Sequence, residues 1–344
     1  MKKIIDVSGF GHSGKSAISE FLAGHEDFFS FPVSVEFELF RVNGGILDLY
    51  FSIFYSWNLI RSKYQINQFR RLILRIGTVA NFRKPLTYLQ SSSHSYNKFF
   101  NNRFIEISQQ YLNDLIVLQD NTFWPYDRLY LSKFDLLLNK LKQKIFKNIP
   151  IKKVYYTNRN NFIPLTSKYI HDLFNEVNDK SSNIVLNNAF DPYNPSVCTE
   201  IIQNSYSIIV ERDPRDIYAS LINSSIGFIP DFENYKLNID QKKKMVSMEN
   251  IDKFILRYKT LMENINHKKN KRLLRIQFED FVQNHEESKI RIFKFLEIPL
   301  DIKRNQIKFN SEDSKKNIGL WKHYSKMPEI IQIQKELTQY CYQD

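Results

Sequence analysis

Residues 9–16 have the types and spacing of a phosphate-binding loop. They read Gly-x-x-x-x-Gly-Lys-Ser, directly after the apolar residues 4–7 and directly before the amphipathic residues 17–22. Glycines let backbone N–H groups turn toward an anion, a helix start adds the positive end of its dipole, and Lys15 adds a point charge. The sequence predicts a site for a phosphate-bearing ligand. The alternative interpretation is a tight strand-to-helix turn with an exposed lysine.

A second segment that can do chemistry begins with Arg212, at the end of another apolar run. Asp213 is a good N-cap, Pro214 is a good first helical residue, and Asp216 stands where a capping-box carboxylate belongs. A helix therefore starts here, with Ser220 about two turns along it. Because α/β sheets bind ligands at the carboxyl ends of parallel strands, we expect a binding site here. The alternative is a capped helix start with surface ion pairs.

The elements that must position these residues alternate between strands and helices. This order predicts an α/β fold, a doubly wound parallel sheet of P-loop type with helices on both faces. We expect one domain over residues 1–344, in which residues 44–150 form a mostly helical insertion that shapes the acceptor site. The expected strands are residues 4–7, 29–37, 153–156, 183–186, 206–211 and 273–278, and the later helices are residues 165–177, 197–204, 245–266 and 286–296.

Composition narrows the class of protein. The net charge is +12, but basic residues are spread along the chain and interleaved with acids, so we expect no nucleic-acid partner. Cys198 and Cys341 lie far apart, and no two histidines have metal-site spacing, so we expect no metal. The start of the chain does not resemble a signal peptide, which predicts a cytoplasmic protein. The oligomeric state is left open.

The apolar residues 46–60 are too few to span a bilayer and include Asp48 and Asn58. We interpret them as a buried helix. Basic residues follow, among them Arg61, Lys63 and Arg70. Peripheral contact with the inner face of a membrane, or with a lipid-linked acceptor, is therefore an alternative role for this region.

Together the two sites resemble the family of sulfotransferases that use 3′-phosphoadenosine 5′-phosphosulfate. Arg212 and Ser220 have the spacing of that family's Arg…Ser pair, within Val-Glu-Arg-Asp-Pro-Arg-Asp-Ile-Tyr-Ala-Ser. Residues 278–282, Phe-Glu-Asp-Phe-Val, and residues 315–322, Lys-Lys-Asn-Ile-Gly-Leu-Trp-Lys, are similar to two later segments of these enzymes. The resemblance covers residues 1–40 and about 180–335.

The resemblance implies which residues bind the donor. The loop would hold its 5′-phosphosulfate, Arg212 and Ser220 its 3′-phosphate, and Lys315 and Lys316 would close over the nucleotide. The loop residues are Gly11, His12, Ser13, Gly14, Lys15 and Ser16. The chain departs from the family pattern at His12, which replaces a basic residue, and at Lys15-Ser16, which replaces Thr-Thr and gives a kinase-type loop. It also has Ser314 in place of arginine and Lys316 in place of glycine.

In the mechanism that this resemblance implies, Lys15 and His12 stabilise the leaving phosphate without a metal ion. Glu36, in the position of the glutamate base of glycan-acting members, takes the proton of the acceptor hydroxyl, with Glu38 as the second choice. His94 and His323 are further candidates. The acceptor is a glycan or glycolipid, most economically a precursor of a bacterial surface polysaccharide.

Two other classes remain open. An ATP-dependent P-loop kinase of a sugar or small molecule needs magnesium and an aspartate after an apolar strand, and Asp120 fits that description. A non-catalytic nucleotide-binding module needs only the loop. A bound magnesium beside Asp120 favours the kinase, and a loop without a nearby base favours the module.

Overall fold

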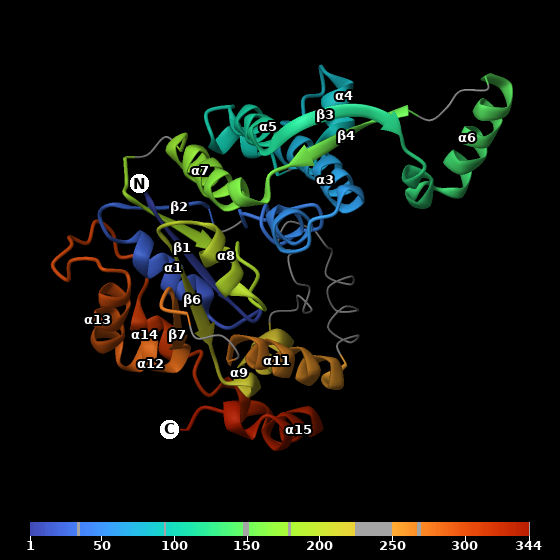
Figure 1. Ribbon diagram of the computed structural model, residues 1–344. Helices are drawn as coiled ribbons and strands as arrows, with labels where there is room; N and C mark the ends of the chain where they lie inside the picture. Colours follow the sequence, from blue (N-terminus) through green and yellow to red (C-terminus); the bar gives the residue numbers. More distant parts are fainter. Residues whose placement is uncertain are drawn as a thin grey trace. The chain divides into compact units, whose positions relative to one another are not determined.

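The computed structural model describes residues 1–32, 35–92, 94–146, 151–177, 180–223, 250–266 and 270–343. The chain forms two compact units (Figure 1). Unit 1 comprises residues 1–41 and 179–344, and unit 2 comprises residues 42–178. The helical region expected at residues 44–150 falls inside unit 2, which also contains residues 151–178.

Unit 1 is built on a five-stranded sheet with the order β2-β5-β1-β6-β7, in which each neighbouring pair is parallel. The central strand pairs on both sides, since Ile5 lies opposite Val185 in one neighbour and Tyr206 in the other. The expected doubly wound parallel sheet is confirmed. The strands are β1 (Lys3–Gly9), β2 (Phe28–Ser30), β5 (Asn183–Asn187), β6 (Ser205–Glu211) and β7 (Leu273–Gln277).

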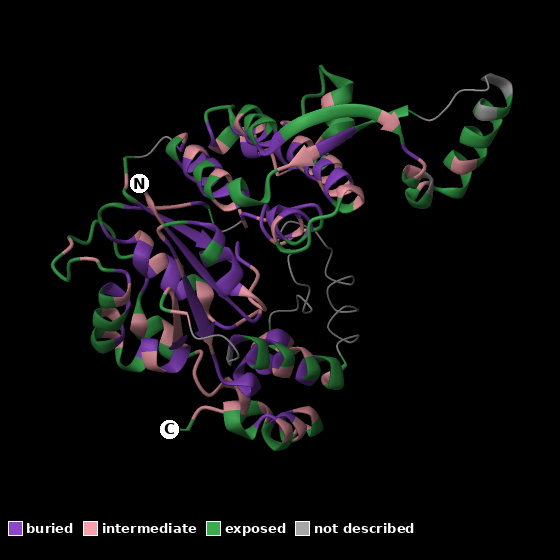
Figure 2. Ribbon diagram, viewed as in Figure 1, coloured by how far each residue is buried: buried purple, intermediate pink, exposed green. Residues whose placement is uncertain are grey.

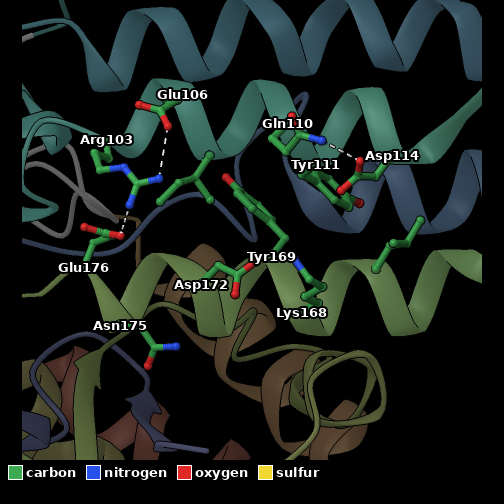
Figure 3. Close-up of a pocket in the computed structure, with 12 residues that line it drawn as sticks. Arg103, Glu106, Gln110, Tyr111, Asp114, Lys168, Tyr169, Asp172, Asn175 and Glu176 are labelled. Carbon is green, nitrogen blue, oxygen red and sulfur yellow. Dashed lines mark hydrogen bonds and ion pairs between the residues drawn. The ribbon is translucent and has the colours of Figure 1, made fainter.

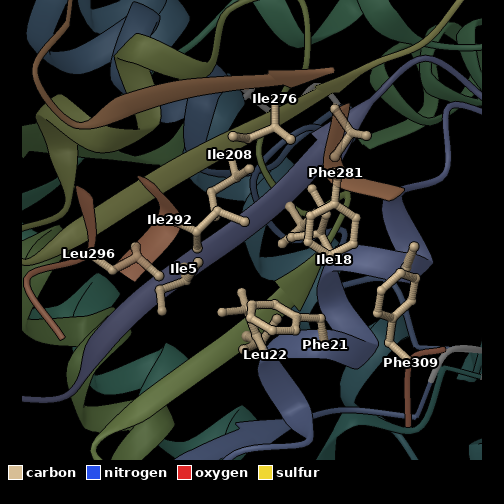
Figure 4. Packing of buried hydrophobic residues seen from close by; sticks show 14 of the residues in the cluster. Ile5, Ile18, Phe21, Leu22, Ile208, Ile276, Phe281, Ile292, Leu296 and Phe309 are labelled. Carbon is tan, nitrogen blue, oxygen red and sulfur yellow. The ribbon is translucent and has the colours of Figure 1, made fainter. Parts of the chain in front are cut away.

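Helices cover both faces of this sheet because its strands alternate their buried side chains. Ile208 and Val210 of β6 pack with one group of helices, whereas Ile209 packs with the other. Figure 4 shows the first group, where Phe21, Leu22 and other apolar side chains meet the strands. That face carries α1 (Lys15–Ala23), α12 (Phe278–Gln283) and α13 (His285–Phe295), and the other carries α9 (Pro214–Asn223), α11 (Ile251–Asn266) and α15 (Pro328–Glu336).

The remaining elements of unit 1 are short. They are α8 (Pro195–Ile201), α14 (Ser311–Lys315), and the 3-10 turns η5 (Leu320–Tyr324) and η6 (Thr338–Tyr340). Figure 2 shows that the strands of the sheet are largely buried while the outer faces of the helices are exposed. The sheet is therefore the rigid element that holds the loops at its carboxyl edge.

Unit 2 is mostly helical but contains a two-stranded antiparallel ribbon, β3 (Ile116–Phe123) with β4 (Ile151–Thr157). Residues 153–156, expected in the parallel sheet, lie in this ribbon, so that expectation is wrong. An apolar run indicates a strand but does not identify its partner. The helical elements are α2 (Ile46–Leu49), the π-helix η1 (Tyr50–Tyr55), α3 (Leu59–Gly77), α4 (Pro85–Gln90), η2 (Tyr96–Phe99), α5 (Phe104–Leu115), η3 (Tyr126–Tyr130), α6 (Lys133–Phe146), η4 (Arg159–Asn161) and α7 (Phe162–Asn175).

Two further expectations change in the structure. The second strand ends at Ser30 rather than at residue 37, because Pro32 has no N–H with which to continue the ladder. Residues 46–60 do not form one buried helix but α2, η1 and the start of α3, in which Ile46, Leu49 and Ile53 are fully buried and Phe51, Tyr55 and Trp57 are exposed. Within the described ranges, no helix is long and apolar enough to cross a bilayer.

Candidate functional site

The glycine loop joins the central strand β1 to the start of α1 at the carboxyl edge of the sheet. His12 and Gly14 both have left-handed backbones, with φ of 62° and 87°. The backbone N–H of Ser13 donates to the carbonyl of Phe10 at 3.1 Å, which closes the turn. The strand–loop–helix context predicted from residues 9–16 is confirmed.

Two glycines are required by what surrounds them. A Cβ on Gly9 would lie 2.4 Å from the carbonyl oxygen of Val210, and one on Gly14 would lie 2.3 Å from the Phe278 ring. A Cβ at either position therefore meets a strand backbone or a buried ring, and the loop keeps its close approach to β6 and α12 only with glycine.

The start of α1 offers donors to an anion. Its N-cap is Gly14, no described side chain caps it, and its first turn carries no acid. The first N–H groups of a helix have no intrahelical partner, so they and the dipole favour an anion here. Lys15 Nζ donates to the carbonyls of Gly9 and Phe10 at 3.4 and 3.3 Å, which places its charge over the loop. The Ser16 side chain is exposed beside it.

Arg212 lies at the carboxyl end of β6, next to the loop. Its guanidinium donates to the carbonyl of His12 at 2.8 Å and to the carbonyl of Asn317, and it lies 5.0 Å from the centre of the Phe278 ring. The side chain is 4% exposed. Arg212 Nε and Ser13 Oγ are buried and make no hydrogen bond to any described residue. The two predicted sites therefore meet, and polar atoms remain available between them.

Ser220 approaches the loop from α9. Its Oγ lies 3.3 Å from Nδ1 of His12. Burial, followed by the charges of Lys15 and Arg212, lowers the pKa of His12 to about 4. The imidazole is therefore neutral at pH 7 and serves as a hydrogen-bonding group rather than as a cation.

The first turn of α9 is buried rather than exposed, so the surface ion pairs of the alternative interpretation are not found. Arg212, Asp213, Arg215 and Asp216 are each at most 8% exposed. Asp213 binds Arg215 in a bidentate ion pair, with contacts of 2.6 and 3.0 Å, and also accepts from the backbone N–H of Arg215 at 2.8 Å. Asp213 is thus the predicted N-cap, and Arg215 neutralises its buried charge.

Asp216 does not act as the capping-box carboxylate that its position predicts. That contact is made by Glu279, whose Oε1 accepts from the backbone N–H of Asp213 at 2.9 Å. Burial raises the pKa of Glu279 to about 7, in spite of bonds from Asp213 and Gln277. Phe278, which packs against Gly14, and Glu279 together give the Phe-Glu-Asp-Phe-Val segment a structural purpose.

Asp216 instead binds the C-terminal segment. Its two oxygens accept from the backbone N–H groups of Gly319 at 2.7 Å and Trp321 at 3.0 Å, and Gly319 has a left-handed φ of 75°. Burial raises the pKa of Asp216, and the two N–H groups oppose that shift. The indole of Trp321 stacks on Arg215, with the guanidinium carbon 3.9 Å from the ring centre. These contacts hold residues 317–321 beside Arg212.

The two lysines predicted to bind the donor lie just before residues 317–321 and are exposed to solvent. Lys315 pairs with Glu312 at 2.6 Å, and Lys316 is exposed at the end of α14. Exposed ion pairs are weak, so that of Lys315 can be exchanged for a ligand at little cost.

Glu36 also lies in unit 1. It is ion-paired with Arg41 and accepts from Asn188 Nδ2 at 3.4 Å. Asn188 follows β5, and its backbone N–H donates to Val7 of β1 at 3.0 Å. Glu36 is therefore held at the carboxyl edge of the sheet through Asn188, rather than by a strand of its own. Asn188 and the buried Asp6, which accepts from Ala189 N–H at 2.8 Å, were not singled out by sequence reasoning.

The aspartate proposed for a kinase, and the aromatic residues that could contact an acceptor, lie in unit 2. Asp120 is exposed on the antiparallel strand β3, which is not part of the sheet that carries the glycine loop. Aromatic side chains of unit 2 could stack on sugars only where they are exposed: Tyr96, Tyr111 and Trp124 are buried, whereas Trp57, Tyr88 and Tyr126 are exposed. Among the described residues, no group of three or more metal-ligating side chains occurs.

A hollow of about 400 Å³ lies on unit 2 between α5 and α7 (Figure 3). Carboxylates pair with two of its cations, since Arg103 pairs with Glu106 and Glu176 and Lys168 pairs with Asp172, while Asp114 accepts a hydrogen bond from Gln110 at 2.6 Å. The two tyrosines that line it are buried and stacked, with ring centres 4.5 Å apart. The charged side chains that line the hollow therefore already have partners, its rings are buried, and we assign it no role.

Comparison with known proteins gives likeness in fold only. No protein-family model matches the sequence, and no curated protein matches it. The sulfotransferase domain of the Synechococcus PCC 7002 olefin synthase is 13% identical, with a TM-score of 0.41, covering 99% of this chain and 94% of that one. The sulfotransferase domain of the curacin biosynthetic pathway is 12% identical, with a TM-score of 0.38, and the match covers 98% of this chain and 97% of that one. Sulfotransferase STF9 from Mycobacterium avium is also 12% identical, with a TM-score of 0.38, and the match covers 98% of this chain and 76% of that one. Similarity at this level carries no argument about activity.

Proposed function

We propose that this protein is a sulfotransferase that moves the sulfonate of 3′-phosphoadenosine 5′-phosphosulfate to a hydroxyl of a glycan or glycolipid. The observation that carries the proposal is the meeting of two anion-binding elements, since Ser220 and Arg212 both contact His12 in the glycine loop. This donor carries a phosphate on the 5′ and on the 3′ oxygen of its ribose, so its binding needs two such elements side by side. A nucleoside triphosphate needs only the loop.

The chemistry of the donor groups fits this ligand. The uncapped helix start, Lys15, and the buried Ser13 Oγ supply donors on the loop side, and Arg212 Nε supplies one on the other. Backbone N–H groups and a lysine suit the modest charge that develops on a leaving phosphate. Gly11, Gly14 and Ser16 complete the cradle, and we assign Lys315 and Lys316 to the nucleotide, toward which they must turn from their exposed positions.

We assign the proton transfer to Glu36. A transferring sulfonate needs an acceptor oxygen that loses its proton, and a carboxylate at the sheet edge can receive it. Glu36 must first exchange its contacts with Arg41 and Asn188 for the acceptor hydroxyl. Lys15 and the neutral His12 then act on the leaving side, where His12 donates or accepts a hydrogen bond without adding a charge.

The acceptor part of the proposal rests on the resemblance to glycan-acting enzymes. We infer a hydroxyl-bearing glycan or lipid-linked glycan, most economically a precursor of a bacterial surface polysaccharide that is made in the cytoplasm. The exposed rings of Trp57, Tyr88 and Tyr126 in unit 2 are of the kind that stack on sugars.

The donor site is tested by titration calorimetry without added metal, with 3′,5′-adenosine bisphosphate and with 5′-adenosine monophosphate. We expect Ser220→Ala to weaken binding of the bisphosphate by about tenfold to a hundredfold, because a hydrogen bond to a charged group contributes about 1.5–3 kcal/mol. The variant should bind the monophosphate, which lacks the 3′-phosphate, as the wild type does. Ser205→Ala is the matched control, since Ser205 begins β6 at the opposite edge of the sheet.

Other results would overturn the proposal. Tight binding of magnesium-ATP with no binding of the bisphosphate supports the P-loop kinase. An equal loss for both nucleotides in Ser220→Ala shows that Ser220 does not recognise a 3′-phosphate. A non-catalytic module is supported if the protein binds the bisphosphate but does not convert the sulfonate donor to the bisphosphate when glycan and lipid-linked glycan acceptors are present.

A further inference from the structure

Helix α6 carries an apolar stripe that no part of the described chain covers. Phe134, Leu137, Leu138 and Leu141 are 68%, 55%, 37% and 48% exposed. Their spacing, i, i+3, i+4 and i+7, puts them on one side of the helix. We call these four side chains the α6 apolar face. Folding of unit 2 leaves this face in water, which is unfavourable unless something else covers it.

Lysines border the α6 apolar face on both sides. Between residues 133 and 144 there are four lysines and one acid, Asp135, which gives a net charge of +3 (4 − 1). At about 100° per residue, Lys133, Lys140 and Lys144 lie along one border of the face and Lys142 along the other. All four are exposed. Long lysine side chains of this kind reach from an apolar boundary to a charged surface.

The surroundings of α6 in the chain extend the apolar surface. Leu129 and Tyr130, in the turn before the helix, are 76% and 56% exposed. At the tip of the ribbon, Phe123 pairs with Ile151, and both are exposed. Figure 1 shows α6 beyond this tip, away from α3, α5 and α7 of the same unit, and Figure 2 shows it as mostly exposed.

We propose that the α6 apolar face docks onto an anionic phospholipid surface, with the helix lying in the interface plane. Exposed phenylalanine and leucine on one side and lysines at the borders are the features of an interfacial helix. Anionic headgroups complement the charge of +3.

This inference goes beyond the proposed transfer reaction and locates the enzyme where a lipid-linked acceptor would be. It does not depend on the donor site, which lies in unit 1. A test without any nucleotide therefore succeeds or fails independently of the proposed function.

The test is co-sedimentation of the full chain with vesicles. One set contains phosphatidylcholine with phosphatidylserine, and the other contains phosphatidylcholine alone. We expect binding to the anionic set, weakened by salt, and much weaker binding to the neutral set. Leu137→Glu should reduce binding to anionic vesicles by about tenfold or more, because it removes an apolar group and adds a negative charge within the face.

Asn139→Glu is the matched control, since it adds the same charge on the opposite side of the same helix. We expect it to reduce binding by no more than about fivefold, the effect of one charge near the surface. Both variants should give the circular-dichroism spectrum and the melting temperature of the wild type, which shows that they fold. The inference is overturned if the wild type does not bind anionic vesicles or if the two variants lose binding equally. It is also overturned if the wild type is a dimer that Leu137→Glu converts to a monomer, which identifies a second copy as the occupant.

Discussion

Asp216 fastens the C-terminal segment to α9, and replacing it by asparagine tests that role. The carboxylate accepts two backbone N–H groups, from Gly319 and Trp321, and is 1% exposed. An asparagine keeps one acceptor oxygen but turns its amide donor toward the second N–H. Since a hydrogen bond to a charged group contributes about 1.5–3 kcal/mol, we expect Asp216→Asn to cost about 2–4 kcal/mol.

We expect this loss of free energy to appear as local opening of residues 317–321, because these residues can detach from α9 while the sheet stays folded. Hydrogen exchange at the amides of Gly319 and Trp321 should then accelerate by about 30-fold to 1000-fold in Asp216→Asn. Asp313→Asn serves as the control, since Asp313 is exposed in α14, just before this segment, and among the described contacts binds the Asn310 side chain. Unchanged exchange at Gly319 and Trp321 in Asp216→Asn would refute the assigned role.

Two predictions concern protons. Burial and like charges hold the pKa of His12 near 4, and a bound anion opposes both effects. Bisphosphate binding should therefore take up more protons in the wild type than in His12→Gln, and the difference in affinity between the two proteins should grow as pH falls. Calorimetry in buffers of different ionisation enthalpy measures the proton uptake, and equal uptake by the two proteins contradicts this prediction. The pKa of Glu279 is about 7 in the folded protein and lower when unfolded, so the folded protein holds the extra proton and loses about 3 kcal/mol of stability as pH rises from about 4.5 to 7. Glu279→Gln should not show this loss, so that in melting curves its Tm should gain on that of the wild type across this range, whereas parallel curves would exclude the assignment.

The sequence allowed the local parts of the site to be predicted because short-range spacing determines them. The glycine loop, the cap at Asp213 and the helix that carries Ser220 each depend on residues within a turn or two of one another. The parallel sheet itself, though not the order of its strands, followed from the alternation of apolar runs with helices. These features are set by backbone geometry and by the period of the apolar pattern.

Partners distant in the chain could not be predicted in this way. Asp216 fits a capping box by position, yet it binds residues more than 100 positions later, and Glu279 takes the contact that Asp216 was expected to make. Likewise, residues 116–123 and 151–157 have the apolar character of sheet strands but pair with each other. Burial can be inferred from one segment, whereas pairing depends on two segments and on the space between them.

Arg212 shows why the choice of variant matters for the donor site. The guanidinium has five N–H donors. Two of its nitrogens hold the carbonyls of His12 and Asn317, so the side chain joins the glycine loop to the C-terminal segment. Its Nε is buried and makes no hydrogen bond among the described residues, so one edge of the same group can serve a ligand. Removing Arg212 therefore disturbs the loop, the C-terminal segment and any bound phosphate at once. Among the described residues, the Ser220 side chain contacts the loop at His12, so its replacement separates recognition of the phosphate from the integrity of the loop.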